Sequence, residues 1–164
     1  MLTRLRSSAI ALLAVTVLAG CLDDPTYPTD PAEFHPDLNI DLAEMTELQT
    51  GLYILDTTGG GGATATDTST IRVHYRGWLK NGQLFDTNRV GTTYPPIEFK
   101  LGQEIVIEGW ELGLPGMREG AVRKLVIPPH LAYGNQAIGP IHPNATLVFE
   151  VELVEVVGAP DTQE

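Results

Sequence analysis

The feature that most constrains the fold of this chain is a run of alternating residues that ends in a tight-turn dipeptide. From position 71 to position 76, apolar or aromatic residues alternate with arginine and histidine, which is the period of a half-buried strand. The run continues to Asn81-Gly82, where both residues tolerate the positive φ of a two-residue hairpin turn. Leu84 and Phe85 then begin a returning strand. The pattern predicts an antiparallel hairpin with one buried face.

Further strands and one short helix are predicted around this hairpin. Strand signals occur near residues 53–55 and at 97–101, 122–127 and 147–153. A helix is predicted over 108–114, with Ile107, Trp110 and Leu114 on one side. Because an antiparallel sheet with one solvated face needs a cover over the other, we expect this helix to cross the concave face. The predicted fold class is α+β, a twisted antiparallel sheet of about five strands wrapped on one short helix.

The chain begins with the pattern of a secretory signal. Residues 1–20 contain Arg4 and Arg6, an apolar run that is too short to span a bilayer, and then small residues. Leu18-Ala19-Gly20-Cys21 resembles the bacterial lipobox, which predicts cleavage after residue 20 and acyl chains on Cys21. The alternative is an ordinary signal that leaves Cys21 as a stray thiol. Cys21 is the only cysteine, so no intramolecular disulfide is expected, and several acyl chains would anchor the protein firmly.

Between this signal and the strands, the sequence predicts a flexible spacer over residues 21–49. Residues 22–37 are rich in proline and acidic residues, a composition that buries too little apolar surface to fold. Leu38, Leu42, Met45 and Leu48 lie near helical spacing and predict a short amphipathic turn. One domain is then expected over residues 50–157, followed by a C-terminal tail over residues 158–164.

Composition argues against several classes of function. The formal net charge is -11, and nothing supplies the clustered cations that nucleic-acid binding needs. The four histidines, at positions 35, 74, 130 and 142, have no helical pairing or clustered partners, so no metal site is expected. The glycine run 59–62 lacks the lysine of a phosphate loop and is predicted to be a hairpin loop. No nucleophile elbow and no suitable acid pair points to hydrolysis.

Five motifs resemble, in order and spacing, the FKBP family of peptidyl-prolyl cis-trans isomerases. They cover essentially the whole predicted domain, whereas the signal and the spacer lie outside the resemblance. The motifs are Val73-His74-Tyr75-Arg76-Gly77, Leu84-Phe85-Asp86, Val106-Ile107-Glu108-Gly109-Trp110, Leu131-Ala132-Tyr133-Gly134 and Ala145-Thr146-Leu147-Val148-Phe149. The resemblance implies an FKBP-like fold and an isomerase that needs no cofactor and no metal.

The resemblance also implies a pocket for a prolyl ring, with Trp110 as its floor. Taken alone, Trp110 and Phe149 would more often be core residues than ligand contacts, and only the combined motifs favour the pocket. The Tyr133 hydroxyl is expected to donate to a substrate carbonyl. The implied catalytic residues are Tyr75, Phe85, Asp86, Trp110, Tyr133 and Phe149, and the implied substrate-binding residues are Val106, Ile107, Ile97 and Ile141.

The segment after Asp86 departs from the family. Members commonly place an arginine a few residues after this aspartate as its ion-pair partner, whereas here Arg89 begins a longer run and its reach to Asp86 stays open. Ile97 or Pro96 stands where an aromatic wall residue is usual, which predicts a more open pocket on this side. The loop between Gly134 and Ala145 is too short for the chaperone domain that some members insert there, so a plain isomerase is expected.

The expected function is isomerisation of Xaa-Pro bonds in exported proteins at the bacterial cell envelope. The partners would be proline-containing polypeptides, macrolide inhibitors such as rapamycin, and a membrane through the lipid anchor. A monomer that faces the periplasm is expected, on the outer membrane rather than the inner because Leu22 follows Cys21. Two alternatives stay open: a tethered, catalytically weak proline-peptide-binding module or chaperone, and a scaffolding lipoprotein with a vestigial pocket.

Overall fold

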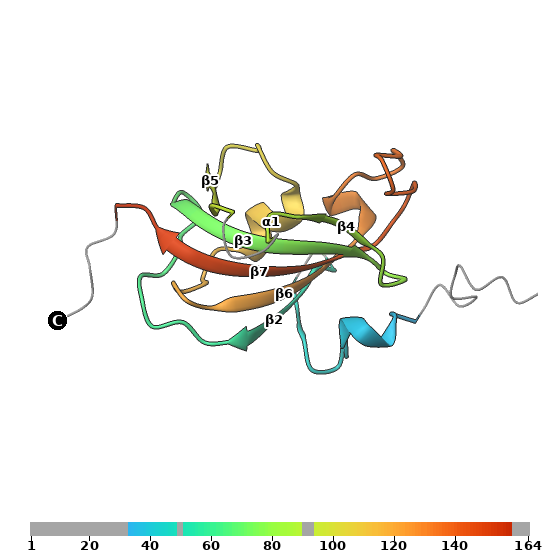
Figure 1. Ribbon diagram of the computed structural model, residues 1–164, viewed down its shortest axis with the longest axis horizontal. Coiled ribbons are helices and arrows are strands. Elements are labelled where there is room, and N and C mark those ends of the chain that lie inside the picture. Colours follow the sequence, from blue (N-terminus) through green and yellow to red (C-terminus); the bar gives the residue numbers. More distant parts are fainter. Residues whose placement is uncertain (1–32, 49–50, 90–93, 159–164) are drawn as a thin grey trace, which may run out of the picture.

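The computed structural model describes residues 33–48, 51–89 and 94–158, which form one curved antiparallel sheet with a helix on one side (Figure 1). The strand order is β1-β2-β6-β7-β3-β4, and β5 also pairs with β3. The strands are β1 (Thr46–Glu47), β2 (Tyr53–Thr58), β3 (Thr70–Leu79), β4 (Leu84–Thr87), β5 (Ile97–Lys100), β6 (Val122–Ile127) and β7 (Leu147–Val156). The helix α1 covers Glu108–Gly113, with Leu114 as its C-cap. The α+β class is confirmed, although the sheet has seven strands rather than about five.

One strand of the sheet, β1, was not predicted from the sequence. β1 forms from residues that were assigned to the spacer, and it pairs with Tyr53 and Ile54 of β2. β4 and β5 are short edge strands that pair with different parts of β3, over residues 76–78 and 70–73 respectively. The two edge strands have four residues each. Both were predicted, from the returning run at Leu84 and Phe85 and from the strand signal at 97–101, so β1 is the strand that the sequence analysis missed.

A turn at the predicted position joins β3 to β4, but it is not the predicted two-residue turn, because Asn81 does not have a positive φ and Leu79 pairs with Gln83 around three turn residues. Gly82 has a positive φ of 87°, and the Asn81 Oδ1 atom accepts the Gln83 N–H at 3.0 Å. The glycine run 59–62, in contrast, is not a hairpin loop. It connects β2 to β3, which are separated in the sheet by β6 and β7. The prediction was wrong because a glycine run indicates a turn but not which strands the turn connects.

The main hydrophobic core lies between the concave face of the sheet and α1. Buried side chains alternate along β3 and β7 as the period of a strand requires. The core includes Ile71 and Val73 of β3, Leu125 of β6 and Val151 of β7, packed with Trp110 of α1. The predicted position of the helix is therefore confirmed.

Residues 33–48 cover part of the opposite, convex face, where Figure 1 shows the short 3-10 turn Pro36–Leu38 in blue. Leu38 and Met45 are buried against Val126 and Val148. The 3-10 turn ends at Asn39 with a positive φ of 48°. The amphipathic helical turn predicted from Leu38 to Leu48 does not form, because residues 42–44 make a hydrogen-bonded turn and Thr46–Glu47 form β1. These residues are packed rather than flexible, because the sheet supplies an apolar surface that the segment alone lacks. Cys21 and residues 1–20 lie outside the described residues.

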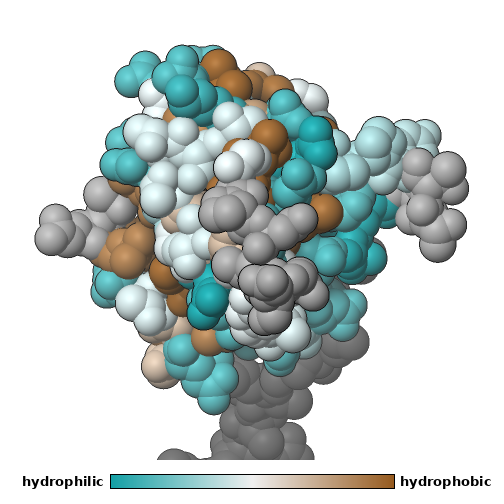
Figure 2. Space-filling model, turned by 90° about the vertical axis from the view of Figure 1, so that its left-hand side faces the viewer, coloured by the Kyte–Doolittle hydropathy of each residue, from teal (hydrophilic) through white to brown (hydrophobic). Residues whose placement is uncertain are grey.

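The exposed surface is mixed in character. On the face drawn in Figure 2, brown hydrophobic residues form separate patches among hydrophilic ones. Single exposed apolar side chains are normal on a folded protein, and here they include Leu84, Ile105 and Leu112. Within the described ranges, no helix has the length and apolar character needed to cross a membrane.

Candidate functional site

The helix α1 lies unusually close to the sheet because two of its residues have no side chain. A Cβ atom on Gly109 would collide with the Ile127 side chain, and one on Gly113 would collide with the Leu125 side chain. Both glycines therefore permit the backbone of α1 to approach β6 directly. The close approach sets the height of Trp110 above the sheet.

The C-terminal end of α1 is held by Arg123 of β6, a buried cation. Its guanidinium donates to the carbonyl oxygens of Gly113 and Pro115 at 2.8 and 3.1 Å, and pairs through two atoms with the Asp56 carboxylate. A cation at this end satisfies carbonyls that the helix leaves free and complements the helix dipole. The buried charge thus fixes the helix that carries Trp110.

The Trp110 indole forms a floor that is surrounded by aromatic rings. Tyr75 of β3 and Phe149 of β7 each lie 5.3 Å from it, edge to face, and Phe85 of β4 packs edge to face on Phe149 at 5.5 Å. This geometry is favourable for aromatic pairs. Gly77 of β3 is required there, because a Cβ atom would come within 2.7 Å of Phe149 and 2.8 Å of Phe85.

These rings border a cavity of about 470 Å³ on the concave side of the sheet. This volume suits a small ligand or one residue with its flanking backbone. The structure brings together every residue predicted for the pocket except Ile141, namely Tyr75, Phe85, Asp86, Ile97, Val106, Ile107, Trp110, Tyr133 and Phe149. Ile97 is partly exposed at its rim.

Ile141 does not line this cavity. It is buried in the main core and pairs through its backbone with Ile138 in the loop before β7. Glu104, Ile105 and Ala132 line the cavity but were not predicted. Glu104 and Ile105 directly precede the motif that begins at Val106, and Ala132 lies inside the motif that ends at Gly134, so the motifs extended by two residues contain all three.

Two carboxylate residues, Asp86 and Glu104, and two tyrosine hydroxyls lie at the cavity. The Tyr75 hydroxyl donates to the Asp86 carboxylate at 2.8 Å. Burial, and then this hydrogen bond and charge, raise the pKa of Tyr75 above its usual 10.0. Burial and the charge of Asp86 also raise the pKa of Tyr133. Both hydroxyls therefore stay protonated as donors at neutral pH.

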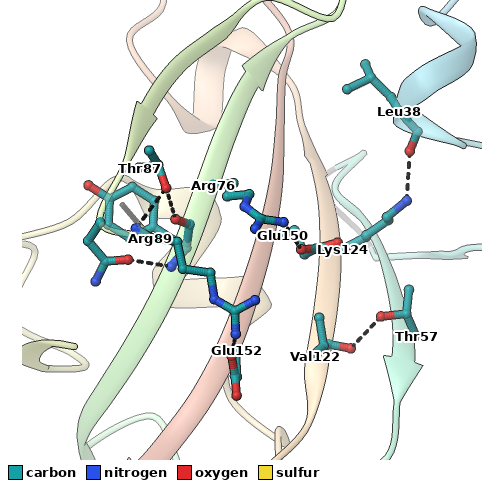
Figure 3. Close-up of polar contacts among 11 residues, drawn as sticks. Leu38, Thr57, Arg76, Thr87, Arg89, Val122, Lys124, Glu150 and Glu152 are labelled. Atoms are coloured by element: carbon teal, nitrogen blue, oxygen red, sulfur yellow. Dashed lines mark hydrogen bonds and ion pairs between the residues drawn. The ribbon is translucent and has the colours of Figure 1, made fainter. Parts of the chain in front are cut away.

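The partner of Asp86 differs from the arginine that is usual in the family. The Arg89 guanidinium forms an ion pair with Glu152 on the convex face, as Figure 3 shows. Tyr75 provides the hydrogen bond to Asp86 instead. The sequence left open whether Arg89 reaches Asp86. The structure shows that the Arg89 side chain points to the other face and pairs with Glu152.

Asn88 is a residue of this region that the sequence analysis missed. Its side-chain oxygen accepts the Tyr75 N–H at 2.7 Å, and its amide nitrogen donates to the Val73 carbonyl at 3.0 Å. No motif marks it, and its role depends on which strand lies beside it.

Few other polar side chains line the cavity. The Trp110 Nε1 atom is buried and has no hydrogen-bond partner among the described residues. In the same part of the chain, no group of three or more His, Cys, Asp and Glu side chains is arranged to hold a metal ion. The arrangement suits binding of an apolar group with a few polar contacts, rather than proton-transfer chemistry.

Comparison with known proteins agrees with this architecture. The family model described as FKBP-type peptidyl-prolyl cis-trans isomerase matches residues 61–154. An FK506-binding protein 4 from Neurospora crassa is 40% identical over 129 residues, which are 79% of this chain and 27% of that protein. Its counterpart from Mycosarcoma maydis is 46% identical over 111 residues, 68% of this chain and 29% of that protein. The chain therefore spans less than a third of the length of these curated relatives.

Solved structures are similar over the same region. The crystal structure of AtFKBP13 has a TM-score of 0.63 and 34% identity, and the match covers 70% of this chain and 99% of that one. FkpA from Escherichia coli has a TM-score of 0.62 and 40% identity, with coverage of 71% and 53%. The family match, these likenesses and the tryptophan-floored cavity lead to one conclusion: the chain belongs to the family of FKBP-type peptidyl-prolyl cis-trans isomerases.

Proposed function

We propose that this protein catalyses the cis-trans isomerisation of Xaa-Pro peptide bonds. The observation that carries the proposal is the cavity floored by the Trp110 indole, walled by Tyr75, Phe85 and Phe149, with Asp86 at its edge. A prolyl ring is a compact apolar group that such a cavity can enclose. Family membership supports the same reaction.

The reaction needs no proton transfer. Rotation about the Xaa-Pro bond is slow because it breaks amide resonance, with a barrier of about 18–20 kcal/mol. The twisted amide has lost its delocalisation and is less dipolar than the planar amide. Transfer from water into an apolar cavity therefore penalises the planar ground state more than the transition state, which lowers the barrier.

A few polar groups would orient the substrate in the cavity. The Tyr133 hydroxyl, which lies at the cavity and stays protonated, can donate to a carbonyl of the peptide. The Ile107 backbone N–H, at the N-cap of α1, is a second candidate donor. The Asp86 carboxylate faces the carbonyl region and biases its orientation by charge. A million-fold acceleration would require these effects to total about 8 kcal/mol.

A protease-coupled assay with a proline peptide tests the proposal. The purified protein should accelerate isomerisation, and Asp86→Ala should lower kcat/KM about tenfold or more. Asp37→Ala is a matched control, since Asp37 is an exposed carboxylate of the 3-10 turn on the convex face. A wild-type rate equal to the uncatalysed rate would rule the proposal out.

A second candidate function is peptide binding with little turnover, as a tethered module or chaperone. The observation in its favour is that Arg89 pairs with Glu152, so Asp86 lacks an arginine partner. This candidate predicts measurable affinity for proline peptides, no change in the isomerisation rate, and unaltered binding after Asp86→Ala. Calorimetric titration beside the rate assay separates the two functions.

We further propose that the protein acts on exported proteins at the bacterial cell envelope. The support is the charge, apolar run and Leu18-Ala19-Gly20-Cys21 order of the first residues. The proposed form is a lipid-anchored monomer that faces the periplasm, on the outer membrane rather than the inner. Binding of macrolides such as rapamycin is part of the same proposal.

Labelling of expressing bacteria with radioactive palmitate tests the anchor. The wild-type protein should take up label and sediment with membranes, whereas Cys21→Ser should do neither. Unlabelled wild-type protein in the soluble fraction would contradict the anchor and leave the proposed isomerase activity untouched. Density-gradient separation of the two membranes then tests the placement.

A further inference from the structure

One edge of β3 carries two short strands with a gap between them. β5 pairs with β3 as far as Val73, and β4 pairs with it from Arg76 onward. Tyr75, whose side chain lines the cavity, lies in this gap. Its backbone therefore lacks the strand neighbour that would normally hold it on this edge. An unpaired backbone group at such a place costs free energy and permits movement.

The side chain of Asn88 fills the gap. Its Oδ1 atom accepts the Tyr75 N–H at 2.7 Å, and its Nδ2 atom donates to the Val73 carbonyl at 3.0 Å. A carboxamide offers one acceptor and one donor in the same plane, as a peptide group does. Asn88 thus provides the pair of hydrogen bonds that a residue of a neighbouring strand would provide.

The residues on either side of Asn88 reinforce this arrangement. The Thr87 hydroxyl donates to the Tyr75 carbonyl at 2.7 Å and accepts the Arg89 N–H at 2.9 Å. Arg89 then reaches the convex face and pairs with Glu152 of β7 (Figure 3). Both backbone polar groups of Tyr75 are therefore held by residues that directly follow Asp86.

We infer that Asn88 is a positioning residue for the Tyr75–Asp86 pair at the edge of the cavity. Its two hydrogen bonds fix the backbone of Tyr75, and the Tyr75 hydroxyl in turn holds the Asp86 carboxylate at 2.8 Å. The inference rests on the proposed isomerase function. Through Tyr75, Asn88 would keep the Asp86 carboxylate in position although no arginine among the described residues pairs with it.

Three variants test the inference: Asn88→Ala, Asn88→Asp and the matched control Asn81→Ala. Asn81 also uses its Oδ1 atom to accept a backbone N–H, that of Gln83, but it lies in the β3–β4 turn away from the cavity. The measurements are kcat and KM for a proline peptide, the Kd for rapamycin, and amide hydrogen exchange at Tyr75 and at core residues such as Val151.

We expect Asn88→Ala to lower kcat about tenfold with a smaller change in KM. Exchange at the Tyr75 amide should rise about tenfold more than exchange at Val151. Asn88→Asp keeps an acceptor for the Tyr75 N–H and loses the donor to Val73, so its effects should be intermediate. Asn81→Ala should leave kcat and Tyr75 exchange as in the wild type.

Equal behaviour of Asn88→Ala and Asn81→Ala would overturn the inference, as would a rise in exchange that is the same at Tyr75 and Val151. The latter result would show a purely structural role. Should Asn88→Ala fail to fold, Asn88→Asp provides the same comparison. A wild-type protein without isomerase activity contradicts the proposed function alone, because Tyr75 exchange and the rapamycin Kd still report on positioning.

Discussion

The two faces of the sheet differ in how their polar side chains are paired. On the convex face, arginines of β3 lie opposite glutamates of β7 and pair with them, as Arg72 does with Glu155. Arg76 pairs with Glu150 in the same way (Figure 3). On the concave face, polar groups are few and those at the cavity keep bonding capacity. The Trp110 N–H has no hydrogen-bond partner among the described residues.

This difference indicates which face of the sheet can bind a ligand. The arginine-glutamate pairs on the convex face are satisfied within the protein, although the His74 Nδ1 atom on this face is buried without a hydrogen-bond partner among the described residues. The cavity on the concave face combines apolar walls with polar groups that still need partners, and a ligand can supply both. The comparison therefore locates binding on the concave face, and mutations on the two faces should differ in their effect on activity.

The largest expected contrast is between the two tryptophans, which lie on opposite faces. Trp110→Leu should lower the free energy of unfolding by about 3 kcal/mol and kcat/KM at least a hundredfold, because it removes the buried floor. Trp78→Leu, on the convex side, should lower stability by about 1–2 kcal/mol and leave kcat/KM unchanged. Urea unfolding and the peptide assay give both quantities. Equal losses of activity in the two variants would break the comparison.

The next largest effect is expected for the cation under α1. Arg123→Met should lower the free energy of unfolding by about 3 kcal/mol, because the Gly113 and Pro115 carbonyls lose their donor and Asp56 loses its partner. Arg118→Met is the matched control, as Arg118 is exposed and donates only to loop carbonyls, and should change stability by less than about 1 kcal/mol. Thermal or urea unfolding measures both changes in the free energy of unfolding. Similar losses in the two variants would show that the Arg123 contacts contribute little to stability.

A smaller effect is expected from the titration of Tyr75. Its pKa is raised in the folded protein, so the unfolded chain loses this proton first as the pH rises. The associated stability is complete below pH 10.0, the usual tyrosine value, and declines above it. Tyr75→Phe should therefore flatten the fall in the free energy of unfolding above pH 10.0. A pH series of urea unfolding curves measures this, and parallel curves for the two proteins would contradict it.

The smallest effect is expected on the convex face. Arg76 and Glu150 are 3.5 Å apart and partly exposed, and such pairs contribute about 0–1 kcal/mol. A double-mutant cycle with Arg76→Ala and Glu150→Ala should give a coupling energy in this range that declines in 1 M salt, with kcat/KM unchanged. A loss of activity in either single variant would show that the convex face takes part in function.

Much of the fold could be predicted because strand periodicity is a local property. The alternation at residues 71–76 and the Asn81-Gly82 dipeptide correctly predicted β3, the position of its turn and its partner β4. The glycine run 59–62 was assigned to the wrong kind of connection, and residues 33–48 were assigned to a spacer although Leu38 and Met45 are buried on the sheet. Both errors concern which distant strand a segment meets, which no local pattern contains.

The site shows the same division. The sequence, through motifs that resemble those of the FKBP family, was enough to predict the apolar and aromatic residues of the cavity, among them Tyr75, Trp110 and Phe149. The tertiary structure alone decided that Arg89 pairs with Glu152, that Asn88 fills the gap beside Tyr75, and that Ile141 lies in the core. The physical reason is that side-chain alternation follows from chain geometry, whereas hydrogen-bond and ion-pair partners depend on which residues the folded sheet brings together.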